Sequence, residues 1–288
     1  MTILISGGTG YLGNALIQHF NKENIAYKIL TRKPTNKNKK WFHGNYLDNS
    51  FDPAALEDVQ CVINLNGANV GEKWWTPSRK KLLRDSRIAH TKFLVEKMKT
   101  FNPSIRKFIS CSAIGYYGDN KNEILTENSK CGDDFMAKLC RDWENAAMAF
   151  GKEKCTILRI GLVLGKNNSF EKKLKPLFTF RIIPLFGGGE QYLSWIHLDD
   201  VVRLFDQATQ NLPHGVYNAV SENPITMKNY FDQKMPSPKL KVHVPSWFVK
   251  GLLGEKAQIV LNSYRVLPSK KISSLLYNRD IDFFKKGN

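Results

Sequence analysis

ILISGGTGYLGNALIQHF, residues 3–20, places a cluster of glycines between a short apolar run and a segment with helix-like spacing. Gly7, Gly10 and Gly13 stand three residues apart, directly after residues 3–6, whose apolar run is typical of a strand. Such a turn lets backbone N–H groups approach a diphosphate, lets the helix pack closely on the strand, and directs the positive end of the helix dipole at the phosphates. The segment therefore predicts a dinucleotide-binding strand–turn–helix unit.

The N-terminal half of the chain alternates between short apolar runs and longer amphipathic stretches. Alternating strands and helices form a parallel sheet with helices on both faces. The predicted fold is therefore α/β, a doubly wound parallel sheet of the Rossmann-like kind. We expect strands at residues 3–6, 27–30, 61–65, 107–110 and 156–160, and helices at residues 14–20, 78–98 and 135–150.

The pattern changes after about residue 165. Residues 166–189 are basic and rich in Phe and Gly, residues 194–207 predict a strand end followed by a helix, and residues 248–261 predict an apolar helix. We expect an NADP-binding domain over residues 1–165 and a smaller C-terminal substrate lobe over residues 166–288. The lobe is expected to return to the sheet at about residues 190–220 and to include a separate segment from about residue 236.

The residues after the second predicted strand indicate which dinucleotide binds. An NAD-selective fold places an acidic residue there, which accepts a hydrogen bond from the ribose 2′-hydroxyl. This chain has Arg32 and Lys33 instead, and no acidic residue between them and Asp48. A guanidinium fork pairs with a 2′-phosphate, and nearby lysines raise the positive potential. The sequence favours NADP(H) over NAD, with an ordinary surface cation as the alternative role of Arg32.

The composition limits the partners and the setting. The 288 residues include 43 Lys and Arg against 26 Asp and Glu, a formal net charge of +17. The basic residues are spread along the chain without a nucleic-acid-binding pattern, which disfavours nucleic acid and favours anionic small molecules. No apolar run has the length of a membrane span and no secretory signal is recognisable, so we expect a cytoplasmic protein. Five cysteines without CxxC spacing argue against a metal site and a disulfide framework.

Motifs along the whole chain indicate a family. Five of them are SGGTGYLG (6–13), NLNGANV (64–70), SCSAIGYYGD (110–119), LRIGLVLG (158–165) and WIHLDD (195–200). Together they resemble the extended short-chain dehydrogenase/reductase superfamily. Residues 71–91, 132–147 and 244–268 look like its atypical branch, whose members are called epimerase family proteins or NAD-dependent epimerase/dehydratase family proteins.

The resemblance implies positions for the cofactor. At the diphosphate it places Gly7, Thr9, Gly10, Tyr11, Leu12 and Gly13, and at the adenosine phosphate Thr31 and Arg32. Beside the riboses it places Leu65, Asn66 and Gly67. Arg87 is implied as a further cofactor contact, and Val163 lies near the nicotinamide. Lys33 joins this set because of its charge. Without the resemblance, Arg87 is equally consistent with a solvated helix charge.

The catalytic pattern of the superfamily is incomplete in this chain. Its members use a Ser or Thr to hold a substrate oxygen, and a Tyr four residues before a Lys as the acid/base group. Ser112 matches the first position, but Phe135 and Leu139 stand at the Tyr and Lys positions. Lys138 is displaced by one residue, which turns a helical side chain through about 100°. The usual Tyr–Lys couple is therefore missing.

Several side chains are candidates to replace the couple or to line a pocket. Tyr116 and Tyr117 follow Ser112 and could offer a phenol, or could pack against the second lobe. For His197 we rank a structural role above a catalytic one. Cys140 and Asp142 are expected to be a core thiol and a surface charge, and three tryptophans are candidates for either pocket or core: Trp74, Trp75 and Trp195.

Two functions are compatible with these observations. The first is NADP-dependent oxidoreduction, or an epimerase-like step, on a small molecule, with Ser112 orienting the substrate and Tyr116 or Tyr117 donating a proton. The second is a non-catalytic NADP(H)-binding sensor or regulatory protein, which the missing Tyr–Lys couple favours.

Overall fold

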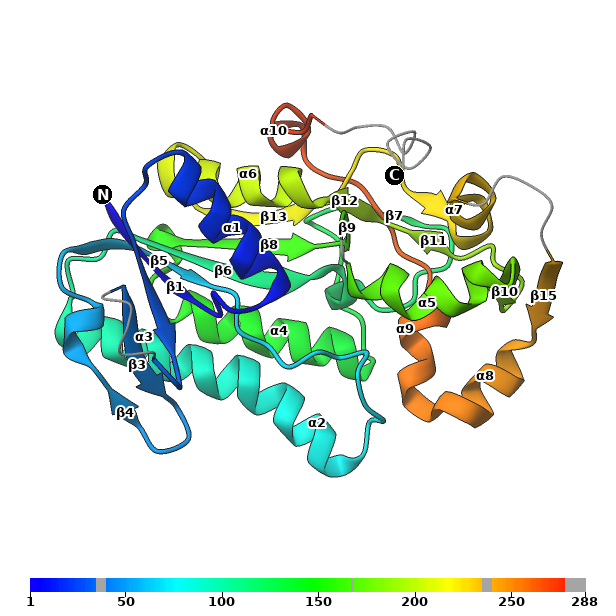
Figure 1. Cartoon of the computed structure of the whole chain (residues 1–288), viewed down its shortest axis with the longest axis horizontal. Helices are drawn as coiled ribbons and strands as arrows, with labels where there is room; N and C mark the ends of the chain where they lie inside the picture. The colour runs from blue at the N-terminus through cyan, green and yellow to red at the C-terminus, as the bar shows by residue number, and fades with distance from the viewer. Residues whose placement is uncertain (35–39, 167, 235–239, 278–288) are drawn as a thin grey trace.

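One large sheet organises the molecule and positions the glycine loop. The computed structural model describes residues 1–34, 40–166, 168–234 and 240–277, and its eight-stranded sheet has the order β13, β8, β6, β5, β1, β2, β3, β4 (Figure 1). Every neighbouring pair is parallel except β3 with β4. The strands are β1 (Thr2–Ser6), β2 (Tyr27–Thr31), β3 (Trp41–Asn45), β4 (Ser50–Phe51), β5 (Val59–Asn64), β6 (Lys107–Ala113), β8 (Cys155–Ile160) and β13 (Gly215–Ala219).

The direction in which strands are added reverses at β1. β1 pairs with β2 on one side and with β5 on the other, so the chain runs outward to β4, returns, and then runs outward through β6 and β8. Doubly wound sheets bind ligands at such a reversal, outside the carboxyl ends of the strands. The predicted α/β fold is confirmed.

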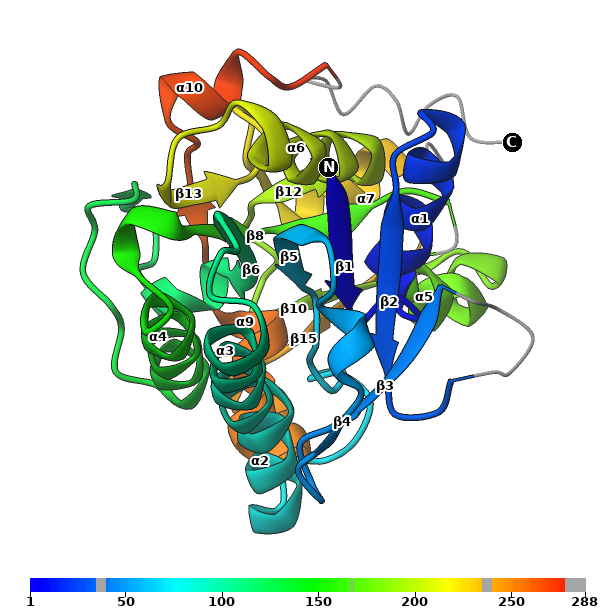
Figure 2. The ribbon, with the colours of Figure 1, turned by 90° about the vertical axis from the view of Figure 1, so that its left-hand side faces the viewer.

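Two layers of helices cover the sheet (Figures 1 and 2). Phe20 and Phe205 of one layer belong to an apolar core on one face, and Leu94 and Met98 of the other layer belong to a second core on the opposite face. Burial of such side chains is the main favourable term in folding. The first layer consists of α1 (Tyr11–Lys22) and α6 (Leu198–Gln210), and the second of α2 (Pro77–Arg84), α3 (His90–Phe101) and α4 (Phe135–Met148).

Smaller elements follow at one end of the sheet, around a third apolar core that includes Trp195 and Tyr230. Short strands pair there as β9 (Leu162–Leu164) with β12 (Trp195–His197), β10 (Ile182–Phe186) with β15 (Leu240–Val244), β11 (Tyr192–Leu193) with β14 (Ile225–Thr226), and β7 (Ile124–Leu125) with β16 (Arg265–Val266). The helices are α5 (Ser169–Thr179), α7 (Met227–Lys234), α8 (Ser246–Leu253), α9 (Gln258–Leu261) and α10 (Lys270–Ser273).

Two of the predicted helices are interrupted. The expected helix at 78–98 consists of α2, the π-helical segment Asp85–Ala89 and α3. The expected helix at 248–261 consists of the end of α8, the 3-10 turn Gly254–Ala257 and α9. A π segment accommodates one extra residue in a helical turn and leaves no signal in apolar spacing.

After residue 165, the described part of the chain contributes one strand to the large sheet. β13 pairs in parallel with β8, with Gly215 opposite Thr156 and Ala219 opposite Ile160. The chain therefore leaves the sheet after β8, forms β9 to β12, and returns at β13. The domain boundary near residue 165 stays a prediction.

The glycine loop is tightly packed between β1 and α1. Gly7 has φ of +88°, a conformation that glycine adopts without steric cost. A Cβ on Gly13 would lie 2.5 Å from the Gly7 carbonyl oxygen and 2.6 Å from Gly8 Cα. Gly13 thus allows α1 to begin directly against the turn that leaves β1.

Gly13→Ala is expected to destabilise the protein, because the new Cβ would overlap backbone atoms that cannot move aside. Overpacking of this kind costs roughly 1–3 kcal/mol in the free energy of unfolding, measurable by urea denaturation followed by circular dichroism. Gly10→Ala is the control, since its Cβ would meet only the Gly7 carbonyl oxygen, at 3.5 Å. Equal losses in the two variants would contradict the packing argument.

Candidate functional site

A cavity of about 320 Å³ lies where β1, β2 and β5 end. It contains six of the residues that the sequence assigned to a cofactor: Gly7, Thr9, Thr31, Arg32, Asn66 and Gly67. The sheet reversal brings these three strand ends together although the residues are far apart in the chain. The remaining lining residues are Ser6, Leu30, Gly44, Tyr46, Ala68, Leu82, Ser86 and His90.

The N-terminus of α1 follows the glycine loop, of which Gly7 and Thr9 line this cavity. Gly10 is the extended N-cap of α1, and neither a capping side chain nor an acidic residue in the first turn compensates the positive end of the helix dipole. The first backbone N–H groups of an α-helix have no acceptor within the helix. This end of α1 therefore suits a diphosphate.

Tyr11 and Leu12 lie in the first turn of α1, but their side chains contact other parts of the protein. The Tyr11 hydroxyl donates to the Lys166 carbonyl oxygen at 3.1 Å, which joins α1 to the chain after β9. Leu12 packs against the apolar core between α1 and the sheet, as do Leu65 and Val163. Any contact of these residues with a cofactor would come from their backbone or from one edge of a half-buried side chain.

Two cations stand at the end of β2. Arg32 lines the cavity, its side chain is exposed, and it forms no ion pair with any residue that the structure describes. Lys33 is exposed as well, and its backbone N–H donates to Thr31 Oγ1 at 3.4 Å. The guanidinium is therefore available to an anionic ligand in the cavity.

A polar cluster that the sequence did not reveal lines the inner part of the cavity. His90 Nε2 lies 2.9 Å from Ser6 Oγ and 2.8 Å from Asn66 Nδ2, and Tyr46 places its ring edge-on to the imidazole at 5.6 Å. Burial, assisted by the charge of Arg32, lowers the pKa of His90 to about 4. His90 is therefore neutral at pH 7, and its Nε2 serves as an acceptor for Asn66.

Arg87 lies in the π-helical segment and reaches behind the loop that follows β5. A Cβ on Gly67 would lie 2.9 Å from the Arg87 guanidinium carbon, and that guanidinium stacks 5.2 Å from the Trp143 ring. Its hydrogen bond goes to the Leu83 carbonyl oxygen at 3.3 Å, and it has no carboxylate partner in the described parts of the chain. Burial lowers the pKa of Arg87, as expected for a cation without a counter-ion.

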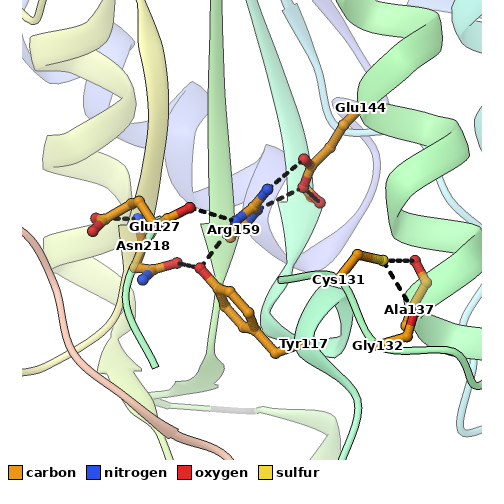
Figure 3. A network of polar contacts seen from close by, with 9 residues as sticks. Tyr117, Glu127, Cys131, Gly132, Ala137, Glu144, Arg159 and Asn218 are labelled. Atoms are coloured by element: carbon orange, nitrogen blue, oxygen red, sulfur yellow. Dashed lines mark hydrogen bonds and ion pairs between the residues drawn. The ribbon is translucent and has the colours of Figure 1, made fainter. Parts of the chain in front are cut away.

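Ser112 and Tyr117 belong to a buried hydrogen-bond network, of which Figure 3 shows Tyr117, Glu144, Arg159 and Asn218. Glu144 accepts a hydrogen bond from Ser112 Oγ at 2.6 Å and two from the Arg159 guanidinium, each at 2.8 Å. Arg159 also donates to the Tyr117 hydroxyl at 3.0 Å, and that hydroxyl donates to Asn218 Oδ1 at 2.6 Å. The five residues are each no more than 4% exposed, so both candidate hydroxyls are occupied inside the protein.

Tyr116 differs from these two candidates. Its side chain is half-buried, and its hydroxyl has no hydrogen-bond partner within the described ranges. The Arg159 guanidinium lies 3.5 Å from the centre of its ring, an arrangement that favours a cation over the aromatic face. Among the three predicted catalytic side chains, only the Tyr116 hydroxyl has no hydrogen bond to another described residue.

An apolar cluster occupies the position of the missing Tyr–Lys couple. Phe135 begins α4, its ring lies 5.1 Å from that of Trp75, and Leu139 is fully buried one turn later. Leu83 and Met136 complete the cluster. Lys138 is exposed, so this part of α4 contains no pair of groups that could exchange a proton.

The other singled-out residues have mostly structural surroundings. Trp195 is buried in the third core, whereas the Trp74 side chain is 54% exposed. His197 is the N-cap of α6 and its Nδ1 accepts the Asp199 N–H at 3.3 Å. Cys140 is a buried thiol, and burial raises its pKa to about 12.

In the described residues, no helix has the length and apolarity to cross a membrane.

Comparison with known sequences places the chain among epimerase-like proteins. Residues 3–219 match the model of the NAD dependent epimerase/dehydratase family. An epimerase family protein of Mycobacterium leprae is 33% identical over 276 residues, which cover 93% of this chain and 88% of that protein. A chloroplastic SDR39U1 homolog of Arabidopsis thaliana is 33% identical over 279 residues, covering 93% of this chain and 80% of that protein. The resemblance inferred from the motifs is confirmed.

Solved structures share the architecture. The crystal structure of human epimerase family protein SDR39U1 with NADPH has a TM-score of 0.85 at 24% identity, covering 98% of this chain and 95% of the human chain. A nucleoside-diphosphate sugar epimerase from Corynebacterium glutamicum has a TM-score of 0.75 at 28% identity, covering 99% of this chain and 57% of that chain. Both similarities support the doubly wound fold described above.

Glu144→Ala is expected to lower the free energy of unfolding by about 3–5 kcal/mol, because it leaves the buried Arg159 without its counter-ion. Asp142→Ala is the matched control on the same helix, since Asp142 pairs with Arg84 at 3.1 Å near the surface, where such pairs contribute about 0–1 kcal/mol. Urea denaturation of both variants measures the difference. A Glu144 variant as stable as the control would show that the network contributes little.

Proposed function

We propose that this chain, which belongs to the NAD dependent epimerase/dehydratase family, binds NADP(H) and uses it for hydride transfer with a small molecule. The observation that supports this most directly is the exposed Arg32 guanidinium, without an ion pair to any described residue, at the cavity where β1, β2 and β5 end. A cation at the end of the second strand binds a 2′-phosphate more strongly than an uncharged 2′-hydroxyl. The human relative solved with NADPH supports the same choice.

Different residues would bind different parts of the dinucleotide. The amides around Gly10 at the N-terminus of α1 would hold the diphosphate, and Arg32 with Thr31 would hold the adenosine phosphate. Asn66, fixed by its hydrogen bond to His90, would face a ribose. When bound, the dinucleotide supplies the hydride donor or acceptor, and the protein supplies orientation and charge.

Proton transfer must use a group other than the usual Tyr–Lys couple. We assign it to Tyr116, because its hydroxyl is free and Arg159 holds its ring from one face. Ser112 and Tyr117, proposed from the sequence as catalytic, would act through the network by fixing Glu144 and Arg159. Tyr116 would serve as a proton donor in the reducing direction.

A second function is favoured by a specific observation. The apolar cluster of Phe135, Leu139 and Trp75 occupies the positions of the superfamily's Tyr–Lys couple. A protein that only senses the NADP(H) pool needs the cofactor cavity and no proton donor. The two functions differ in whether any small molecule is turned over.

Arg32→Ala is expected to weaken NADPH binding roughly tenfold to a hundredfold, because one charged hydrogen-bonding group contributes about 1.5–3 kcal/mol. NADH binding should change little, since NADH lacks the 2′-phosphate. Isothermal titration of both dinucleotides measures the two effects. Lys22→Ala, an exposed cation at the far end of α1, is the control. Comparable losses for NADPH and NADH would exclude the proposed role of Arg32.

Tyr116→Phe is expected to abolish or strongly reduce NADPH oxidation with a substrate drawn from aldehydes, ketones and nucleotide sugars, while NADPH affinity stays unchanged. General acid catalysis contributes typically 10²–10⁴-fold, so the loss in kcat should fall near that range. Absorbance at the reduced-nicotinamide band follows the reaction. Tight NADPH binding without turnover of any compound by the unmodified protein would favour the sensor.

A further inference from the structure

β15 has a pairing strand on one side only. It forms a two-stranded parallel sheet with β10, and no other described strand pairs with it. The Leu240 N–H donates to the Arg181 carbonyl oxygen, at the start of β10, at 2.9 Å. Main-chain groups alternate in direction along a paired strand, so the N–H and C=O groups of Lys241 and His243 point away from β10. The outer edge of β15 therefore offers hydrogen-bonding groups that no described strand uses.

Exposed apolar side chains continue from this edge onto the next helix. Leu240 and Val242 are exposed in β15, and α8 adds Trp247, Phe248 and Leu252. Phe248 and Leu252 are four residues apart and so lie on the same side of α8. β15 and α8 follow one another at the right-hand end of the molecule in Figure 1. We call these five residues the β15–α8 patch, and apolar surface of this kind marks an interaction site.

The patch carries little charge, although the chain as a whole has a formal net charge of +17. Lys241 is paired with Asp232 of α7 at 3.0 Å, and Lys250 is the only other Lys, Arg, Asp or Glu in β15 and α8, both of which are fully described. Surfaces that bind lipid place several Lys or Arg around their apolar side chains. The centres of protein–protein interfaces are instead poor in charge and rich in aromatic residues. The patch therefore favours a protein partner of equally low charge.

A second copy of β15 has this property and matches the edge. In an antiparallel arrangement with a two-fold axis at Val242, Val242 faces its own copy and Lys241 stands opposite His243 of the second copy. Lys241 and His243 are the residues whose main-chain groups point outward, and residues opposed in this way exchange two hydrogen bonds. The two small sheets would join into one, in the order β10, β15, β15, β10. One register therefore satisfies the main chain and the symmetry together.

α8 enlarges this contact beyond the strand edge. A standard interface buries about 800 Å² on each partner, more than one short strand provides. A covered aromatic side chain buries about 150–250 Å², and α8 exposes Trp247 and Phe248 directly after the strand. Trp is enriched among the residues that dominate the free energy of binding. We therefore expect Trp247, which is 74% exposed, to be the main contact of the helix.

We propose that two copies of this chain associate through the β15–α8 patch, by antiparallel pairing of β15 and packing of the α8 side chains. The inference goes beyond the proposed function and does not depend on it. None of the patch residues lines the cavity where β1, β2 and β5 end. Each copy therefore keeps its own cavity for the dinucleotide.

Sedimentation velocity of the full chain, from micromolar to submillimolar concentrations, measures the association. We expect a species of twice the chain's mass, whose affinity rises with salt because each copy carries the same net charge of +17. Val242→Lys and Val242→Glu should each weaken the dimer by about tenfold or more, because like charges would face each other across the axis. An equimolar mixture of these two variants should restore the dimer.

Controls separate this surface from others. Leu47→Lys changes an exposed leucine in the turn between β3 and β4, at the opposite end of the molecule (Figure 1), and should leave the dimer unchanged. Trp247→Ala should weaken the dimer by about tenfold or more, whereas Trp74→Ala, an exposed tryptophan that precedes α2, should not. His243→Pro removes an outward N–H and leaves the bonds between β15 and β10 in place, so it should also weaken the dimer. It decides the question if the Val242 variants fail to fold.

Three results would overturn the proposal. The first is a chain that sediments as a monomer at every concentration. The second is a dimer that persists unchanged in Trp247→Ala and His243→Pro, which would assign the contact to another surface. The third is a monomer that binds phosphatidylserine vesicles and loses this binding in Trp247→Ala, which would make the patch a lipid-binding surface. NADPH affinity, measured by titration, is independent of all three.

Discussion

The close approach of α1 to β1 at Gly13 is the constraint on which the site depends. Because a Cβ there would overlap Gly7 and Gly8, only glycine lets α1 start directly above the end of β1. The strand order reverses at this same strand, so β2 and β5 deliver Arg32 and Asn66 to either side of the helix N-terminus. The anion-binding geometry thus arises from sheet topology and helix packing together.

The cationic side chains on the two sides of β6 differ in how completely they are paired. Toward β5, cations such as Arg87 and Arg79 lack full partners and face the loop that borders the cofactor cavity. Toward β13, Arg159 is fully satisfied by Glu144 and Tyr117. Burying an ion pair costs desolvation free energy, which a two-pronged geometry with further hydrogen bonds can offset. The Arg159 network therefore joins β6, α4, β8 and β13.

The sequence predicted those parts of the site that are formed by residues adjacent in the chain. The spacing of Gly7, Gly10 and Gly13, and the replacement of an acid by Arg32, each follow from a few adjacent residues. The partnership of Ser112 with Glu144, and of His90 with Ser6, joins residues of different elements whose side chains meet only after packing. Strand β3 was missed because WFHGN lacks a clear apolar alternation, and for the same reason β13, GVYNA, was expected only as a return to the sheet at about residues 190–220.

During synthesis, β13 is made long after β8, the strand with which it pairs. β8 ends at Ile160, but its outer edge is covered only when residues 215–219 arrive and pair in parallel with it. Until then the nascent chain displays an unpaired strand edge, the kind of surface that invites association with other chains. Closing such a distant pair is entropically slow, so the intervening segment delays completion of the sheet that holds Asn218 against Tyr117.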